Sequence, residues 1–172
     1  GVAAKPDNRS IWSSAGATLV HGDYFSPTRR TEIGIPDVPR SYMRIIPAGW
    51  KTGTPSIAEI ANLEESHKVT APSTGGAYGD FGPTDEGYVW YWVTDKRDHD
   101  LAAAGNMLMY FEDTGEFWML HAGAIAGHQD HYLLRDHPML GAWSSLLRQS
   151  MRLMDSFGAQ KIRRVEAGLF GV

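Results

Sequence analysis

The chain contains no cysteine, and this absence excludes several kinds of chemistry. None of its 172 residues is cysteine, so disulfide bonds, cysteine-ligated zinc, iron–sulfur centres and thiol catalysis are impossible. Long apolar runs are also missing: none approaches the roughly 20 residues that a transmembrane helix needs. We therefore expect no membrane partner. A reducing cytoplasm is compatible with a cysteine-free chain, and we take it as the expected location.

An excess of basic charge is absent as well. The 16 Lys and Arg residues are outnumbered by 20 Asp and Glu residues, which gives a formal net charge of −4. A general nucleic-acid surface normally shows a basic excess, so this balance argues against one. The pairs Arg29–Arg30 and Arg163–Arg164 are expected to be solvated. A hydrophobic content of 42% with 21% charged residues is ordinary for a globular domain.

The composition predicts one structured domain with a short extension. Residues 1–16 are mostly polar and are expected to be loose, whereas residues 17–172 are long enough to bury one core. Gly1 stands where a Met is expected, and the chain stops within a strand-like Leu-Phe-Gly-Val pattern. Both ends predict a piece of a longer protein.

A group of aromatic segments between Gly87 and Gly123 predicts the centre of the fold. The segments GYVWYWVT, NMLMYFED and EFWMLHAG are prone to form strands, and a glycine turn at Thr114–Gly115 joins the last two. They predict an antiparallel sheet. In the first segment, the residues on both faces are apolar: Tyr88, Trp90 and Trp92 on one, and Val89, Tyr91 and Val93 on the other. We therefore expect both faces of the sheet to be covered.

The remaining patterns complete an α+β fold. Strands are predicted at Ala17–Phe25, Ser41–Pro47 and Lys161–Val172. A short helix is predicted to open at Thr54-Pro55-Ser56 and to run through Glu64, with Ser56 and Glu59 at capping-box spacing. A long helix from Pro138 with an apolar stripe ends at Gly158. The segments Ser66–Glu86 and Gly127–Pro138 are expected to be loops. The order β-β-α-β-β-β-α-β predicts a mainly antiparallel sheet with two helices packed on it.

The aromatic sheet is the candidate ligand site. Tyr88, Trp90 and Trp92, together with Trp118 or His121 and with the cation of Arg44, suit a flat or anionic small molecule. The alternative is that these side chains form ordinary core, with His121 buried beside a hydrogen-bonding partner.

A histidine-rich segment supplies a second candidate. His128, Asp130 and His131 carry ligand types that zinc or iron prefers, so a divalent metal and a metal-dependent enzyme are an alternative. Otherwise this segment is a solvated loop. The string AGHQDH partly resembles the HxHxDH motif of metallo-β-lactamase-fold hydrolases, but Ala126 replaces the first histidine and too few His or Asp residues follow. The chain lacks a GxSxG elbow and a GxxxxGK[ST] loop. No catalytic residue is assigned.

Three separated segments carry a resemblance to a known family. They are PRSYMRIIPAGW, DEGYVWYWV with GEFWMLHAGAIAG, and the stretch from His137 to Val172. Together they resemble the C-terminal accessory region of bacterial proteins with an N-terminal AlbA-type, Schlafen-like DNA-binding domain, which are grouped with helix-turn-helix proteins. The resemblance begins near Pro39 and implies that nucleic acid would be contacted only by an N-terminal domain absent from this chain. Its motifs are structural, so no catalytic residue is carried over.

These observations favour a non-enzymatic function. We expect a regulatory or sensor-like accessory domain without a cofactor, which binds a small ligand or a partner through the aromatic sheet face. The alternatives are the metal-dependent enzyme and a dimerisation or assembly module whose sheet face forms a homodimer.

Overall fold

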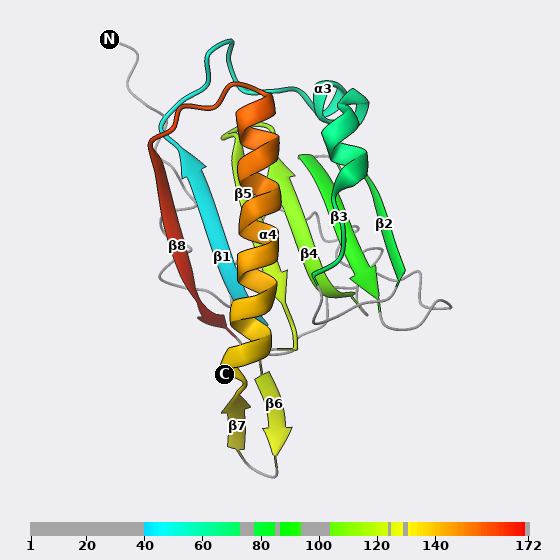
Figure 1. Ribbon diagram of the computed structural model, residues 1–172, viewed down its shortest axis with the longest axis vertical. Coiled ribbons are helices and arrows are strands. Elements are labelled where there is room, and N and C mark those ends of the chain that lie inside the picture. The colour runs from blue at the N-terminus through cyan, green and yellow to red at the C-terminus, as the bar shows by residue number, and fades with distance from the viewer. Residues whose placement is uncertain are drawn as a thin grey trace.

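The computed structural model describes residues 40–72, 78–84, 87–93, 104–123, 125–128 and 131–170 (Figure 1). The strand predicted at Ala17–Phe25 and the loose extension of residues 1–16 lie outside these residues. The elements in chain order are β1 (Arg40–Pro47), α3 (Ile57–Asn62), the 3-10 helix η1 (Glu64–Lys68), β2 (Tyr78–Pro83), β3 (Gly87–Val93), β4 (Ala104–Phe111), β5 (Glu116–His121), β6 (Ile125–His128), β7 (His131–Leu134), α4 (Asp136–Ser156) and β8 (Arg163–Phe170).

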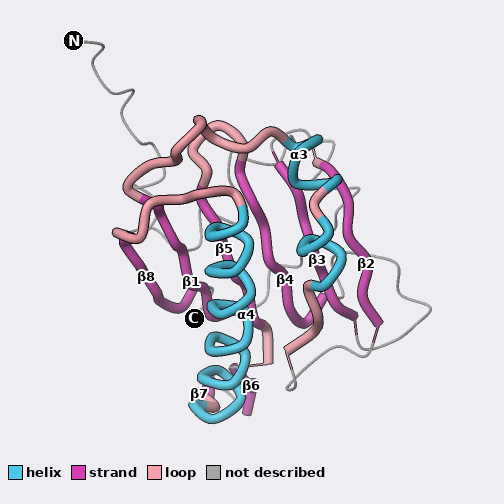
Figure 2. The backbone as a smooth tube through the Cα atoms, turned by 45° about the horizontal axis from the view of Figure 1, so that its top comes forward, coloured by secondary structure: helices cyan, strands magenta, loops and turns pink. Residues whose placement is uncertain are grey.

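One antiparallel sheet organises the described chain. Its six strands lie in the order β2-β3-β4-β5-β1-β8, and all neighbours are antiparallel. Helices α3 and α4 lie over the same face of this sheet (Figures 1 and 2). The predicted α+β fold with a mainly antiparallel sheet and two helices is thus confirmed, although the element order differs in detail.

The differences come from two segments that were predicted to be loops. The segment Ser66–Glu86 contains most of η1 and the edge strand β2, in which Phe81 pairs with Trp90 of β3. The sequence YGDFGP of β2 has low strand propensity, so its conformation depends on the neighbouring strand. The segment Gly127–Pro138 likewise contains β7, which pairs with β6 in a separate two-stranded hairpin.

Local signals at the helix ends are confirmed. The Ser56 hydroxyl accepts from the Glu59 N–H at 3.2 Å, and the Glu59 carboxylate accepts from the Ser56 N–H at 2.7 Å, which forms the predicted capping box. Gly158 follows α4 with a φ of +75°, as a left-handed C-terminal cap requires. Leu140 belongs to the apolar stripe that predicts this helix, but in the structure it is 57% exposed.

Buried hydrogen bonds fasten the short helices to the aromatic core. The Trp90 indole N–H donates to the Ser66 carbonyl at 2.8 Å, and the Tyr110 hydroxyl donates to the Pro55 carbonyl at 2.5 Å. Burial, and then the charge of Glu112, raise the pKa of Tyr110 far above its ordinary value, so its hydroxyl remains a donor. These bonds fix α3 and η1 against strands β3 and β4.

Apolar residues on the opposite face of the sheet are buried too. Met107, Met109, Phe111 and Leu120 are each at most 4% exposed there. The expectation of two buried faces is therefore confirmed. Among the described residues, no helix combines the length and the apolar character that crossing a bilayer requires.

Candidate functional site

The strand register divides the six predicted ligand-binding residues between the two faces of the sheet. Tyr88 pairs with Tyr110, which pairs with Phe117, so these residues share a face. The same reasoning places Trp90, Trp92 and His121 on this helix-covered face. Arg44 pairs with Trp118 on the opposite face. The six side chains therefore do not form one continuous floor.

The three aromatic residues of β3 on the helix side are part of the core. Tyr88, Trp90 and Trp92 are 3%, 1% and 6% exposed, and they cluster with residues of α3 and α4. The ring centroids of Tyr88 and Trp90 lie 4.8 Å apart. A ligand could reach these rings only if the covering helices moved away.

His121 is a buried histidine paired with Asn106. Its Nδ1 lies 2.6 Å from the Asn106 Oδ1, and the residue is 1% exposed. Burial, and then the positive charge of Arg40, lower the pKa of His121 to about 4. The imidazole is therefore neutral near pH 7 and does not face solvent, which makes it unsuited to exchange protons with a substrate.

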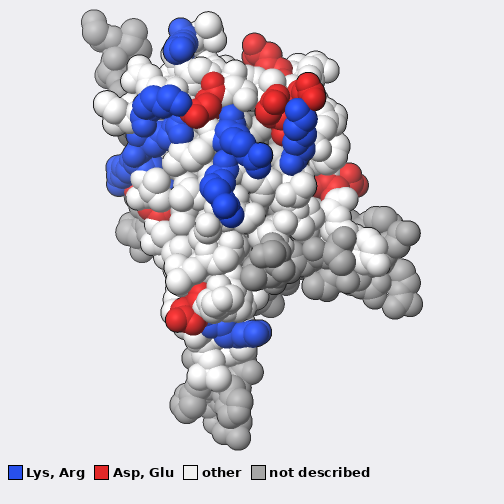
Figure 3. Space-filling view, viewed as in Figure 1, with Lys and Arg blue, Asp and Glu red and all other residues white. Residues whose placement is uncertain are grey.

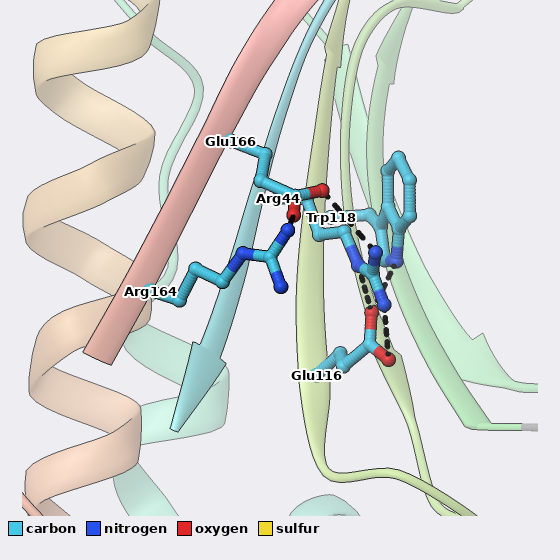
Figure 4. A network of polar contacts seen from close by, with 5 residues as sticks. All are labelled: Arg44, Glu116, Trp118, Arg164 and Glu166. Carbon is cyan, nitrogen blue, oxygen red and sulfur yellow. Dashed lines mark hydrogen bonds and ion pairs between the residues drawn. The ribbon is translucent and has the colours of Figure 1, made fainter. Parts of the chain in front are cut away.

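Arg44 and Trp118 belong to a buried ionic network on the other face (Figure 4). The Arg44 Nε and Nη2 donate to the two carboxylate oxygens of Glu116 at 2.5 and 2.9 Å, and Nη1 donates to Glu166 at 3.2 Å. The Trp118 indole N–H donates to Glu116 at 3.0 Å. The Arg44 guanidinium carbon also lies 5.3 Å from the centre of the Trp118 ring, within range of a cation–π interaction.

This network joins three strands. Arg44 on β1 binds Glu116 on β5 and Glu166 on β8, and Arg164 forms an ion pair with Glu166. Arg44 is fully buried and Glu116 is 0% exposed. Since each guanidinium nitrogen of Arg44 already has an acceptor, the network is a structural clamp across β5, β1 and β8.

The candidate metal ligands lie on the β6–β7 hairpin. His128 and His131 are register partners at its closed end, while Asp130 lies outside the described residues. No group of three or more histidine, aspartate or glutamate side chains suited to a metal occurs in the described part of the chain.

An open cavity that sequence reasoning missed lies beside α4. A cavity of about 620 Å³ is lined by Thr70, Ser145, Leu147, Arg148, Gln149, Met151 and Arg152. A neighbouring cavity of about 230 Å³ is lined by Glu65, Lys68, Val69, Gln149, Arg152 and Leu153. They share Gln149 and Arg152, and we call them together the α4 groove.

Gln149 fixes the wall of the α4 groove. This buried side chain accepts from the Thr70 N–H at 2.6 Å and donates to the Thr70 carbonyl at 2.8 Å. The amide thus holds the segment after η1 against the middle of α4. The wall is therefore set by the fold before any ligand binds, which lowers the ordering cost of binding.

Positive charge borders the α4 groove. Arg148 and Arg152 are exposed and lie one helical turn apart. The Arg148 Nε donates to the Ser144 carbonyl at 3.2 Å, and within the described part of the chain neither arginine forms an ion pair with a carboxylate. Lys68 is paired with Glu64 at 2.7 Å and with Glu65 at 3.5 Å. Figure 3 shows basic side chains gathered over the upper half of α4, with acidic ones among them.

Two like charges at this spacing repel each other, which weakens the helix. A bound anion would remove that repulsion and accept hydrogen bonds from both guanidinium groups.

The spacing of the two arginines on the polar side of an amphipathic helix is visible in the sequence, but Thr70 and Gln149 are brought together only by tertiary packing.

Comparison of the chain with protein-family models, with curated proteins and with solved structures finds no match.

Proposed function

We propose that this chain is a non-enzymatic, sensor-like accessory domain that binds a small anionic ligand in the α4 groove. The observation that carries the proposal is the pair of exposed guanidinium groups, Arg148 and Arg152, beside a preformed cavity of about 620 Å³. Carboxylate and phosphate groups are the ligands that such a pair favours, because guanidinium binds both in a bidentate manner.

The placement differs from the aromatic face that the sequence suggested. The aromatic residues of β3 are buried under α3 and α4, and Arg44 is engaged by Glu116 and Glu166. The α4 groove is open to solvent, so a ligand can reach it without any rearrangement of the core. A ligand in the groove would add contacts between α4 and the segment after η1, so its binding would strengthen the attachment of that segment to α4.

The accessory role also draws on the resemblance to the C-terminal region of AlbA-type, Schlafen-like proteins, which stays a prediction, as does a cytoplasmic location. In that setting the ligand would act on a neighbouring nucleic-acid-binding domain through the groove. The chain itself would make no contact with nucleic acid.

A thermal-unfolding titration tests the proposal. Inorganic pyrophosphate and citrate serve as probes, because both carry several closely spaced negative charges. A ligand that binds only the native state stabilises it by about 2.7 kcal/mol at one hundred times its dissociation constant. For a domain of this size, that free energy raises Tm by about 5–11 °C.

Matched variants locate the effect. The double variant Arg148→Gln with Arg152→Gln should lose the increase in Tm, whereas Arg135→Gln, which removes an exposed arginine just before α4, should keep it. Equal stabilisation of all three proteins, or stabilisation by neither probe, would show that the α4 groove does not bind small anions.

A metal site on the β6–β7 hairpin is the second candidate. The specific observation that favours it is the register pairing of His128 with His131, with Asp130 between them in sequence. Elemental analysis of the purified chain should then find stoichiometric zinc or iron that disappears in the variant His128→Ala with His131→Ala. A metal-free protein with unchanged stability in this variant would exclude the candidate.

A further inference from the structure

Strand β8 forms one edge of the described sheet. It pairs with β1 in unbroken register, from Arg40 opposite Phe170 to Pro47 opposite Arg163, and no strand of the described residues pairs with its other side. Figure 1 shows β8 as the outermost strand next to β1. An edge strand of this length offers backbone donors and acceptors to another chain.

Apolar side chains follow this edge on the side of the sheet that carries α4. Val165 and Leu169 are 47% and 38% exposed, and Ala167 between them is exposed too. Their partners on β1 include Met43 and Ile45, which are buried in the core. The apolar face therefore continues from the core to the outer edge of the described sheet, as at surfaces that bind another protein.

The charged residues of β8 favour a second copy of this chain as its partner. We propose that β8 pairs with β8 of a second copy of this chain, antiparallel about a twofold axis at Val165. In this register Arg164 lies opposite Glu166 of the partner subunit, and the symmetry repeats the pair. Opposite charges at directly facing positions stabilise antiparallel strands, and the twofold axis makes the surface self-complementary.

Neighbouring registers are disfavoured. In the nearest alternative registers that keep both copies of α4 on the same side of the sheet, the twofold axis moves by one residue along β8, to Arg164 or to Glu166. It then places either Arg164 opposite Arg164 of the partner subunit or Glu166 opposite Glu166 of the partner subunit. Like charges that face each other directly destabilise the pairing. A shift of the register by one residue would instead place Val165 opposite a residue from the polar face of the second copy's β8.

The charged residues are already suitably placed for this contact. Glu166 is held by Arg44 at 3.2 Å and by Arg164 of its own chain, and its side chain is 13% exposed, so little freedom is lost when the partner subunit's Arg164 approaches it. The Arg164 side chain is 65% exposed and pairs with Glu166 of its own strand, so in the dimer it would lie between this carboxylate and Glu166 of the partner subunit. The resulting dimer has one continuous sheet and carries both α4 grooves on the same side.

This inference does not depend on ligand binding in the α4 groove. A cysteine cross-link tests the register directly, since the natural chain has no cysteine. The two Cα spacings of antiparallel pairs both lie within the range that a disulfide spans. Val165→Cys should form a disulfide-linked dimer under mild oxidation, whereas Leu133→Cys, on the equally exposed Leu133 of β7, should stay largely monomeric.

Sedimentation velocity of the whole chain provides the second measurement. The natural protein should show a dimer whose share rises with concentration. Val165→Lys should be monomeric at the same concentrations, because it puts two like charges on the axis, and Leu133→Lys should still dimerise. Circular dichroism checks that each variant folds. A natural protein that stays monomeric would overturn the proposal. So would a dimer that persists in Val165→Lys, or equal cross-linking of the two cysteine variants.

Discussion

Removal of the Glu116 carboxylate should strongly destabilise the fold, because Arg44 and Glu116 form a buried ion pair. In Glu116→Ala, the fully buried Arg44 loses its bidentate partner and keeps, among the described carboxylates, Glu166 at 3.2 Å. Loss of one partner of a buried ion pair costs about 3–5 kcal/mol. Because Glu166 still compensates part of the charge, we expect a value near the lower end.

That loss is a large share of the total free energy of unfolding, which is about 5–15 kcal/mol for a typical domain. Urea unfolding with linear extrapolation measures it, and the slope m should be unchanged, since the same surface is exposed on unfolding. In a thermal experiment on a chain of this size, Tm should fall by about 6–20 °C.

A double variant distinguishes the cost of a buried charge that has lost its partner Glu116 from the cost of lost packing. Arg44→Met with Glu116→Leu removes both charges, and apolar replacement of a buried pair is often nearly neutral. The Trp118 indole N–H loses its acceptor in both proteins, so that cost cancels in the comparison. The double variant should therefore be more stable than Glu116→Ala by about 2 kcal/mol or more. A double variant as unstable as the single one would refute this reasoning.

Two further predictions concern His121 and the glycines of the sheet. The pKa of His121 is about 4 in the folded chain against an ordinary 6.5. Between these two pH values the imidazole is protonated in the unfolded chain and neutral in the folded chain. Stability should fall as pH drops from 6.5 towards 4, by about 3 kcal/mol at most. This part of the slope should vanish in His121→Gln, and an identical slope in both proteins would show that another group titrates. At Gly87, an added Cβ would lie 1.7 Å from the Tyr110 carbonyl oxygen, whereas Gly82 has nothing within 4 Å. Gly87→Ala should cost about 3 kcal/mol or more and Gly82→Ala should cost little; equal urea midpoints would contradict the close packing of β3 on β4.

Elements with strong local signals were predictable from the sequence. The aromatic strands β3, β4 and β5, the capping box at Ser56 and the end of α4 at Gly158 all follow from short-range patterns. The turn between β4 and β5 was placed correctly, although its loop has four residues between Phe111 and Glu116. Strand β2 was missed because a glycine-rich segment becomes a strand only through its neighbour.

The sites depend on contacts between distant residues, which no short pattern contains. Arg44 was visible as a cation within an apolar strand, but its partner Glu116 lies 72 positions further along the chain. Only the register of β1 on β5 brings the two together. The alternation within β3 grouped Tyr88, Trp90 and Trp92 correctly, yet it carried no information on whether a helix covers them.

The α4 groove illustrates the same limit. Arg148 and Arg152 have the spacing of one helical turn, which is readable from the sequence. The opposing wall at Thr70 lies 79 positions before Gln149, and its approach to α4 is a result of packing. A cation pair becomes a candidate site only when such a wall stands beside it.

The most direct test of the account is an isotope-edited NMR titration that observes the arginine Nε–H signals while inorganic pyrophosphate is added to the whole chain. The signals of Arg148 and Arg152, identified by their absence in the single variants Arg148→Gln and Arg152→Gln, should shift and saturate, while that of the buried Arg44 stays in place. Signals of Arg148 and Arg152 that do not move, or that drift without saturation together with every other exposed arginine, would contradict a specific anion site in the α4 groove.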